Sequence, residues 1–105
     1  GVDHYDFLVE NGEDCLTWKI FEIPQINGPS IEIIKQVNHR LIWLCREKHT
    51  LSNDRGQIQR KDYGIYSIVG GFLDEDDFSL RLNGKIFNGI FKKKFNSCQL
   101  ISEIN

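Results

Sequence analysis

The sequence predicts an all-β domain, a small closed or nearly closed β-barrel of about eight short strands. Turn signals punctuate the chain at short intervals: Asn-Gly occurs at 11–12, 27–28, 83–84 and 88–89, and Gly-Gly at 70–71. The segments between them are short and rich in β-branched and aromatic residues. No segment has the length and period of a long helix. A barrel suits such a chain because closure leaves no exposed strand edge.

An N-terminal hairpin is the first predicted element. Large apolar side chains recur at every second position of residues 5–9, so one side of this strand would build the core. The turn at 11–14 leads to a second strand at Cys15–Ile20. Residues 30–37 could start a short helix capped by Ser30, but their β-branched content favours a strand. Leu41–Cys45 is an uninterrupted apolar run, which predicts a fully buried strand.

The second half of the chain predicts six more short strands. The first two pair around 62–64, and the next two flank Asn83-Gly84, the clearest hairpin signal in the chain. In chain order the strands are 57–60, 65–69, 78–82, 85–87, 90–95 and 99–104. The stretch GGFLDEDD at 70–77 is typical of a mobile, solvated loop.

Size and composition point to a single domain over residues 1–105. The sequence contains no Met, so we expect native residues to precede Val2. The three cysteines form no C-x-x-C pair, and we expect buried thiols in a reducing cytoplasm rather than a zinc site. No apolar run approaches the roughly 20 residues of a membrane span, and no signal peptide is visible. We therefore expect a cytoplasmic monomer without a membrane partner.

The net charge of −2 conceals blocks of opposite sign. Residues 1–34 contain seven acidic residues and one basic residue, whereas residues 35–61 contain seven basic and two acidic residues. The blocks could neutralise each other across neighbouring strands. Alternatively, the basic block could receive phosphates, with Arg40, Arg55 and Arg60 contacting nucleic acid.

His4 and Asp6 form the first candidate site. Residues two apart in a strand project to the same side, so an imidazole nitrogen and a carboxylate oxygen could share a divalent ion such as Mn²⁺, Fe²⁺ or Zn²⁺. Two ligands do not make a tight site, so a third must come from elsewhere. The structural alternative is a pair of exposed polar residues on a half-buried strand.

His39 and Arg40 form the second candidate site. An imidazole beside a guanidinium could grip or protonate a phosphate, which would make these residues catalytic. The alternative is a histidine at the entry to a strand, bonded to the backbone. Lys92-Lys93-Lys94 is most simply a solvated edge that blocks aggregation, or else a nucleic-acid path. Trp18 and Trp43 are most simply core residues.

The order of these motifs resembles the 3′-phosphoesterase domain of bacterial DNA ligase D and its small stand-alone relatives. The resemblance covers most of the chain. It is carried by His4–Glu10, Leu16-Thr17-Trp18, Asn38-His39-Arg40, Ser52–Gly56, Arg60, Asp62, Gly64, Tyr66, Leu82-Asn83-Gly84 and Gly89-Ile90-Phe91.

The resemblance implies a compact β-barrel that trims 3′ ends in DNA repair, removing a terminal ribonucleoside or a 3′-phosphate before ligation. Its cofactor would be a divalent metal, typically Mn²⁺, held in the family by two histidines and one aspartate. His4 and Asp6 match two of these ligands, and His39 matches the histidine that engages the scissile phosphate. The implied partners are 3′ termini of DNA or RNA-ended DNA, together with a ligase or polymerase.

Several positions depart from the family pattern. The other metal-binding histidine precedes the His-Tyr-Asp motif by a few residues and is not among residues 1–105. Leu8 stands where the family has an arginine, Val37 where it has an acid, and Trp43 where it has a tyrosine. The alternative function is therefore a catalytically weakened module of the same fold that binds nucleic acid or a repair partner. A purely structural interaction barrel is a third hypothesis.

Overall fold

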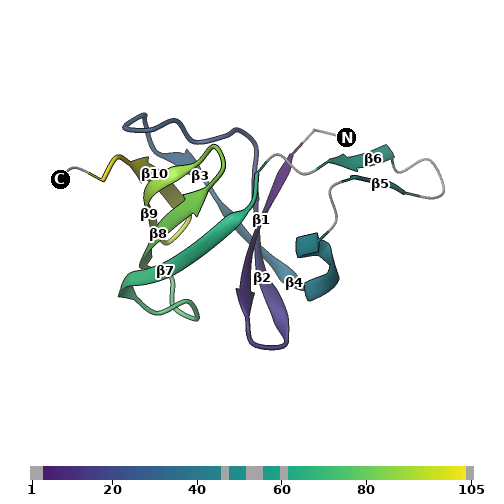
Figure 1. Cartoon of the computed structure of the whole chain (residues 1–105). Helices are drawn as coiled ribbons and strands as arrows, with labels where there is room; N and C mark the ends of the chain where they lie inside the picture. The colour runs from purple at the N-terminus through teal and green to yellow at the C-terminus, as the bar shows by residue number, and fades with distance from the viewer. Residues whose placement is uncertain (1–3, 46–47, 52–55, 60–61, 104–105) are drawn as a thin grey trace.

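The computed structural model describes residues 4–45, 48–51, 56–59 and 62–103, which form an all-β fold (Figure 1). This confirms the predicted fold class. A three-stranded sheet has the order β1-β2-β4, and a five-stranded sheet has the order β3-β10-β9-β8-β7. All pairings within these sheets are antiparallel. The bounds are β1 (Tyr5–Asn11), β2 (Asp14–Ile20), β3 (Ile31–Glu32), β4 (Ile34–Arg40), β7 (Gly64–Gly71), β8 (Phe78–Gly84), β9 (Asn88–Lys94) and β10 (Ser97–Ile101).

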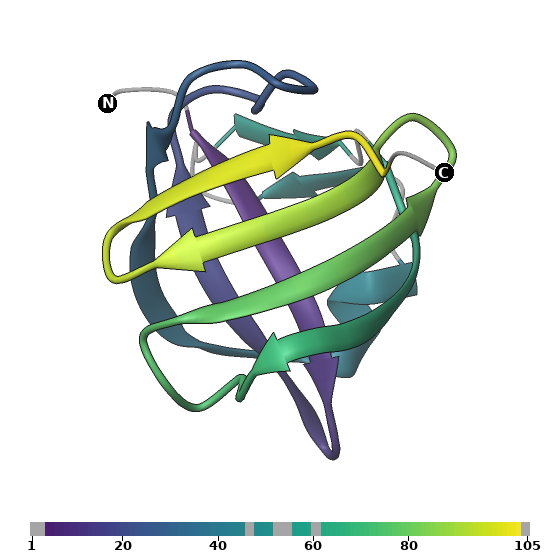
Figure 2. The same ribbon diagram turned by 90° about the vertical axis from the view of Figure 1, so that its left-hand side faces the viewer.

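The two sheets lie against each other and are joined along one side by the chain itself (Figures 1 and 2). Ile33 separates β3 from β4, is almost fully buried, and donates its backbone N–H to the Asn96 carbonyl at 2.9 Å. On the other side, the Tyr66 hydroxyl of β7 donates to the Glu10 carbonyl of β1 at 2.5 Å. Among the described strands neither sheet closes on itself, so the closure of a barrel is not seen.

Aromatic rings fill the space between the sheets. Phe7 of β1 stacks against Phe91 of β9 with ring centroids 4.7 Å apart, and Trp18 of β2 lies 5.4 Å from Phe78 of β8. Rings in tilted contact at such distances add to the free energy of burial. Trp18 is 2% exposed, which confirms it as a core residue; the side chain of Trp43 lies outside the described residues. The predicted inward side of β1 is also confirmed, because Val9 is buried beside Phe7.

The prediction for residues 30–37 is confirmed, since they form β3 and the first half of β4 rather than a helix. The expected buried thiols are found at Cys15 and Cys98, both free. Burial raises the pKa of Cys98 to about 11, an effect that the nearby Lys93 ammonium partly offsets. The side chain of Cys45 is outside the described part of the chain. No helix in that part is long and apolar enough to cross a membrane.

Leu41–Cys45 is not a strand. It forms the 3₁₀ helix η1, which follows β4 and packs against β1. A short apolar run cannot distinguish a strand from a helical turn, because both can bury it. The run is also not fully buried, since Ile42 is 52% exposed.

The predicted pairing of 57–60 with 65–69 is also wrong. Strand β6 (Gly56–Gln59) pairs with β5 (Lys48–Leu51) to form a separate hairpin. Strand β7 pairs with β8 instead. Strand β7 begins two residues after Asp62, whose carboxylate binds the backbone of residues 85–87, and its first residue, Gly64, pairs with Gly84 of β8.

The Asp62 carboxylate replaces strand pairing at one corner of the molecule. It accepts backbone N–H groups from Tyr63, Lys85, Ile86 and Phe87 at 2.8–3.1 Å. Burial would raise the pKa of Asp62, but these four donors hold it below its ordinary value. The β8–β9 turn therefore falls on residues 85–87, not on Asn83-Gly84, and the predicted strand at 85–87 is wrong.

The three consecutive lysines are not a solvated edge. Strand β9 lies between β8 and β10, and Lys93 is only 5% exposed. Its Nζ donates to the carbonyls of Asp76 and Phe95, both at 2.7 Å, and lies 5.5 Å from the Phe78 ring. Burial lowers the pKa of Lys93, although the Asp76 and Asp77 carboxylates oppose this shift. Lys92 and Lys94 point outward, as alternation requires.

The segment at 70–77 is more structured than a solvated loop. Its two glycines belong to β7, and Leu73 is buried in the core. Gly71 has φ +70°, and a Cβ there would lie 2.4 Å from the Asp77 carbonyl, so the turn requires glycine. The Lys93 ammonium group holds the end of this segment through its hydrogen bond to the Asp76 carbonyl.

Asp62→Asn should destabilise the fold. The amide keeps only one of the two acceptor oxygens, so two backbone donors lose their partner, at a cost of about 1–2 kcal/mol at pH 7. Because the folded-state pKa of Asp62 is lowered, the wild-type advantage is present above the unfolded pKa of about 3.9 and disappears as pH falls through the folded value. Urea unfolding of both proteins from pH 7 to pH 2.5 measures this difference.

The control for this experiment is Asp74→Asn, at an acidic residue of the 70–77 segment. It should change the free energy of unfolding by less than about 0.5 kcal/mol. An Asp62→Asn effect that persists unchanged at pH 2.5 would contradict the role of the charged carboxylate.

Phe91→Ala should cost about 3–5 kcal/mol of stability, because it leaves a cavity against Phe7. The matched control is Phe95→Ala, the same change at a ring that is 67% exposed, with an expected cost below about 0.5 kcal/mol. Equal losses in chemical denaturation would show that the contact between the sheets does not dominate the core.

Candidate metal and phosphate site

The candidate residues lie on the outer face of the three-stranded sheet, the side away from the core. Residues opposite each other in an antiparallel ladder share a face. Asp6 is opposite Lys19, whereas Glu10 is opposite Cys15, which is in turn opposite His39. Asp6, Glu10 and His39 are therefore on one face, and the core residues of β1 are on the other.

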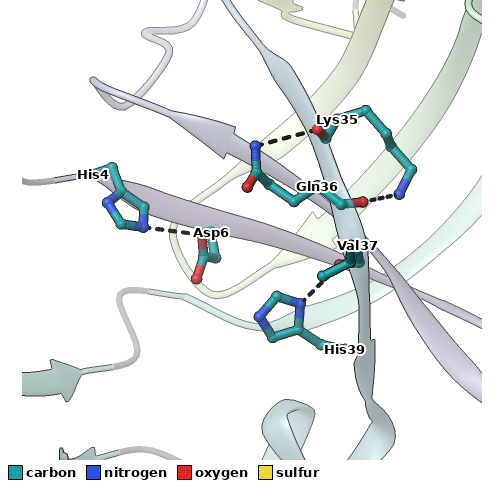
Figure 3. Close-up of polar contacts among 6 residues, drawn as sticks. All are labelled: His4, Asp6, Lys35, Gln36, Val37 and His39. Atoms are coloured by element: carbon teal, nitrogen blue, oxygen red, sulfur yellow. Dashed lines mark hydrogen bonds and ion pairs between the residues drawn. The ribbon is translucent and has the colours of Figure 1, made fainter.

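His4 and Asp6 meet as the i, i+2 spacing predicts. The His4 Nε2 lies 3.4 Å from the Asp6 Oδ1, and both side chains are a little more than one-third exposed. Figure 3 shows the two groups projecting together from the beginning of β1. The donor set, one imidazole nitrogen and one carboxylate, suits cations of intermediate hardness such as Mn²⁺. Both groups are partly exposed, so a cation in solution can reach them.

His39 is held by its own strand. Its Nδ1 lies 3.2 Å from the Val37 carbonyl, so the backbone fixes the plane of the imidazole (Figure 3). In the neutral tautomer with hydrogen on Nδ1, that N–H donates to the carbonyl and Nε2 is the acceptor. The backbone bond expected from the structural alternative is thus present. It also orients the ring, as a group that handles protons or phosphate would require.

His39 does not join His4 and Asp6 as a third metal ligand. On the shared neighbour β2, Asp6 is opposite Lys19 and His39 is opposite Cys15. These two partners are four positions apart along the strand. Within residues 4–45, 48–51, 56–59 and 62–103, no three His, Cys, Asp or Glu side chains converge to hold a metal. The arrangement is a two-ligand half-site with a separate imidazole on the same face.

Arg40 occupies a different position from His39. It is the last residue of β4, opposite Asp14, and as the next residue along the strand it falls on the other side of the sheet. Its side chain is exposed at the edge of the sheet. Arg55 and Arg60 lie outside the described residues. Of the basic segment, only Lys35 and Arg40 therefore have described side chains.

Sequence reasoning missed two residues of this region. Glu10 shares the outer face with Asp6, which alternation four residues further along β1 could have revealed. Lys35 lies 5.4 Å from the Trp18 ring and donates to the Asn38 Oδ1 at 3.2 Å. Burial lowers the pKa of Lys35, with an opposing effect from Asp14. Through these contacts Lys35 links β4 to the Trp18 ring of β2 at the edge of the sheet.

The chain has no match among protein-family models, curated proteins or solved structures.

Mn²⁺ added below stoichiometry at pH 7.5 should broaden amide resonances most strongly around His4, Tyr5 and Asp6, because the His4 imidazole and the Asp6 carboxylate would hold the ion. Asp6→Asn should abolish this local effect, whereas Glu10→Gln, a matched change on the same face, should preserve it. Amide spectra recorded with and without the metal provide the measurement. Broadening centred on the acidic residues 74–77, or insensitive to Asp6→Asn, would contradict the half-site.

Proposed function

We propose that this chain is a Mn²⁺-dependent phosphoesterase that processes 3′ ends of nucleic acids in DNA repair or end joining. The observation that carries the proposal is the exposed His4–Asp6 pair on the same sheet face as the backbone-oriented His39. The resemblance in motif order supplies the substrate class. The two facing sheets would be an open form of the barrel that the resemblance implies.

The roles of the residues follow from their chemistry. Asp6 would offer an anionic oxygen and His4 a neutral imidazole nitrogen to the ion, with water and substrate oxygens as its remaining ligands. When bound, the ion would act as a Lewis acid toward phosphoryl oxygens. With both ring nitrogens protonated, His39 would keep its Nδ1–H bond to the Val37 carbonyl and donate from Nε2 to a phosphoryl oxygen, or give that proton to the leaving oxygen.

The basic residues would position the rest of the substrate. Arg40, exposed at the edge of β4, would contact a neighbouring phosphate of the same strand. We assign Arg55 and Arg60 the same positioning role on the basis of the sequence alone. A cytoplasmic monomer that acts together with a ligase or polymerase remains the working hypothesis.

One observation favours the second candidate function, a nucleic-acid-binding module with weakened catalysis. Leu8 lies on the outer face between Asp6 and Glu10, where the resemblance calls for an arginine. An alkyl group cannot donate to a phosphoryl oxygen, so the charge stabilisation that an arginine provides is lost there. The half-site with only two ligands also favours a binding module with weakened catalysis.

A 3′-phosphorylated primer–template should release inorganic phosphate in the presence of Mn²⁺ and the protein, and EDTA should stop the release. Asp6→Asn and His39→Gln should each lower the rate at least about 100-fold, because each removes a group that acts on the reacting phosphate. Glu10→Gln is the control on the same face and should stay within about twofold of wild type.

Two outcomes would reject catalysis. The first is release that survives EDTA or Asp6→Asn, which would indicate a contaminating enzyme. The second is no release at all, combined with oligonucleotide binding that weakens on Arg40→Ala but not on Asp6→Asn. That second outcome would establish the binding module instead.

A further inference from the structure

One of the Asn-Gly pairs in the chain lies in a different environment from the others. The pairs are at 11–12, 27–28, 83–84 and 88–89. In such a pair the backbone nitrogen of the glycine can attack the amide carbon of the asparagine side chain, because glycine has no side chain that obstructs the approach. The reaction requires that both groups are free to come together. The structure therefore decides which pair can react.

Hydrogen bonds hold both members of the pair Asn27-Gly28. The Asn27 Oδ1 accepts the Ser102 backbone N–H at 3.0 Å, and its Nδ2 donates to the Ser102 Oγ at 3.0 Å. The Gly28 N–H donates to the Gln25 carbonyl at 2.8 Å. Neither the side-chain amide nor the glycine nitrogen can rotate without breaking these bonds.

The glycines of the two pairs beside the β8–β9 turn are also closely surrounded. The Gly84 N–H donates to the Phe87 carbonyl at 3.1 Å, and a Cβ on Gly84 would lie 2.6 Å from the Asp62 Oδ2. Gly89 is buried within β9, where a Cβ would lie 2.5 Å from the Ile101 carbonyl. The surrounding backbone keeps both glycine nitrogens in place.

The pair Asn11-Gly12 has none of these restraints. It lies at the turn between β1 and β2, which projects beyond the rest of the molecule (Figures 1 and 2). Asn11 is exposed, and across the described residues no hydrogen bond engages its side chain or the Gly12 N–H. Apart from the adjoining residues, no atom lies within 4 Å of a Cβ placed on Gly12. The pairing of Asn11 with Asp14 ends the ladder, so it can open without disturbing the core.

We propose that Asn11-Gly12 is a site of spontaneous deamidation. The Gly12 nitrogen loses its proton to a base in solution and attacks the Asn11 Cγ. The new N–Cγ bond closes a cyclic imide, and the Cγ–Nδ2 bond breaks with release of ammonia. Water then opens the ring at either carbonyl, which gives aspartate or isoaspartate. The reactants are this chain and water, so the proposal goes beyond the proposed function and does not depend on it.

Isoaspartate changes the hairpin at a sensitive place. Its main chain runs through the side-chain carbon and is one atom longer, so residue 11 loses its register with Asp14. The preceding residue is Glu10, whose carbonyl accepts the Tyr66 hydroxyl. The new carboxylate also lies next to Glu10 in the sequence and close to Glu13, and like charges repel. Deamidation therefore loosens the margin at which β1 and β7 are linked.

Trypsin cleavage separates the four pairs, so one sample contains its own controls. The fragments 1–19, 20–35, 82–85 and 86–92 each contain a single asparagine. The folded protein is incubated at pH 8.5 in EDTA, and mass spectrometry measures the conversion of amide to acid in each fragment. Fragment 1–19 should react at least about tenfold faster than each of the others. In guanidinium chloride, which removes the structural restraints, the four rates should agree within about threefold.

The effect on the fold is tested with Asn11→Gln, which keeps an amide but would have to close a larger ring. Wild-type protein aged to half-conversion should unfold at a lower urea concentration than fresh protein, whereas aged and fresh Asn11→Gln should unfold together. Equal rates for the four fragments in the folded protein, or a faster reaction in any fragment other than 1–19, would overturn the site. An unchanged urea midpoint after conversion of wild type would overturn the loosened margin.

Discussion

The contact between Phe7 and Phe91 is the constraint on which the rest of the molecule depends. It joins the strand that carries the candidate metal ligands to the middle of the five-stranded sheet. Since β1 buries Phe7 and Val9 on one side, Asp6 and Glu10 must project from the other. A one-residue slip of β1 would exchange these faces and remove both the core ring and the metal half-site.

Local sequence patterns predicted the features that depend on neighbouring residues. The i, i+2 spacing of His4 and Asp6 needs only an extended backbone, and the structure brings the two groups within 3.4 Å. Alternation likewise identified the inward side of β1, and β-branching identified β3 and β4. These arguments involve only a few consecutive residues, which is why they hold in the folded chain.

The features that sequence could not predict depend on distant partners. Leu41–Cys45 becomes a helical turn because β4 ends at Arg40 and the chain then packs across β1. Lys93 is buried because the carbonyls of Asp76, seventeen residues earlier, and Phe95, just after β9, accept hydrogen bonds from its ammonium group. The position of His39 along its sheet depends on the irregularity in the pairing between Cys15 and Thr17, which no motif announces. Whether a third ligand reaches His4 and Asp6 likewise depends on the pairing register of strands that are distant in the sequence.

The bond from the Tyr66 hydroxyl to the Glu10 carbonyl has a mechanical consequence. Within the described strands, β1 pairs only with β2 and β7 only with β8, so this phenol links two otherwise unpaired edges. Ile33 lies at the opposite margin, where the chain passes from β3 of one sheet to β4 of the other. The two sheets are thus joined covalently at one margin, through Ile33, and by a hydrogen bond at the other, through Tyr66. Burial, together with the Glu10 carboxylate, raises the pKa of Tyr66, so the Tyr66 hydroxyl keeps the proton of this hydrogen bond well into alkaline solution.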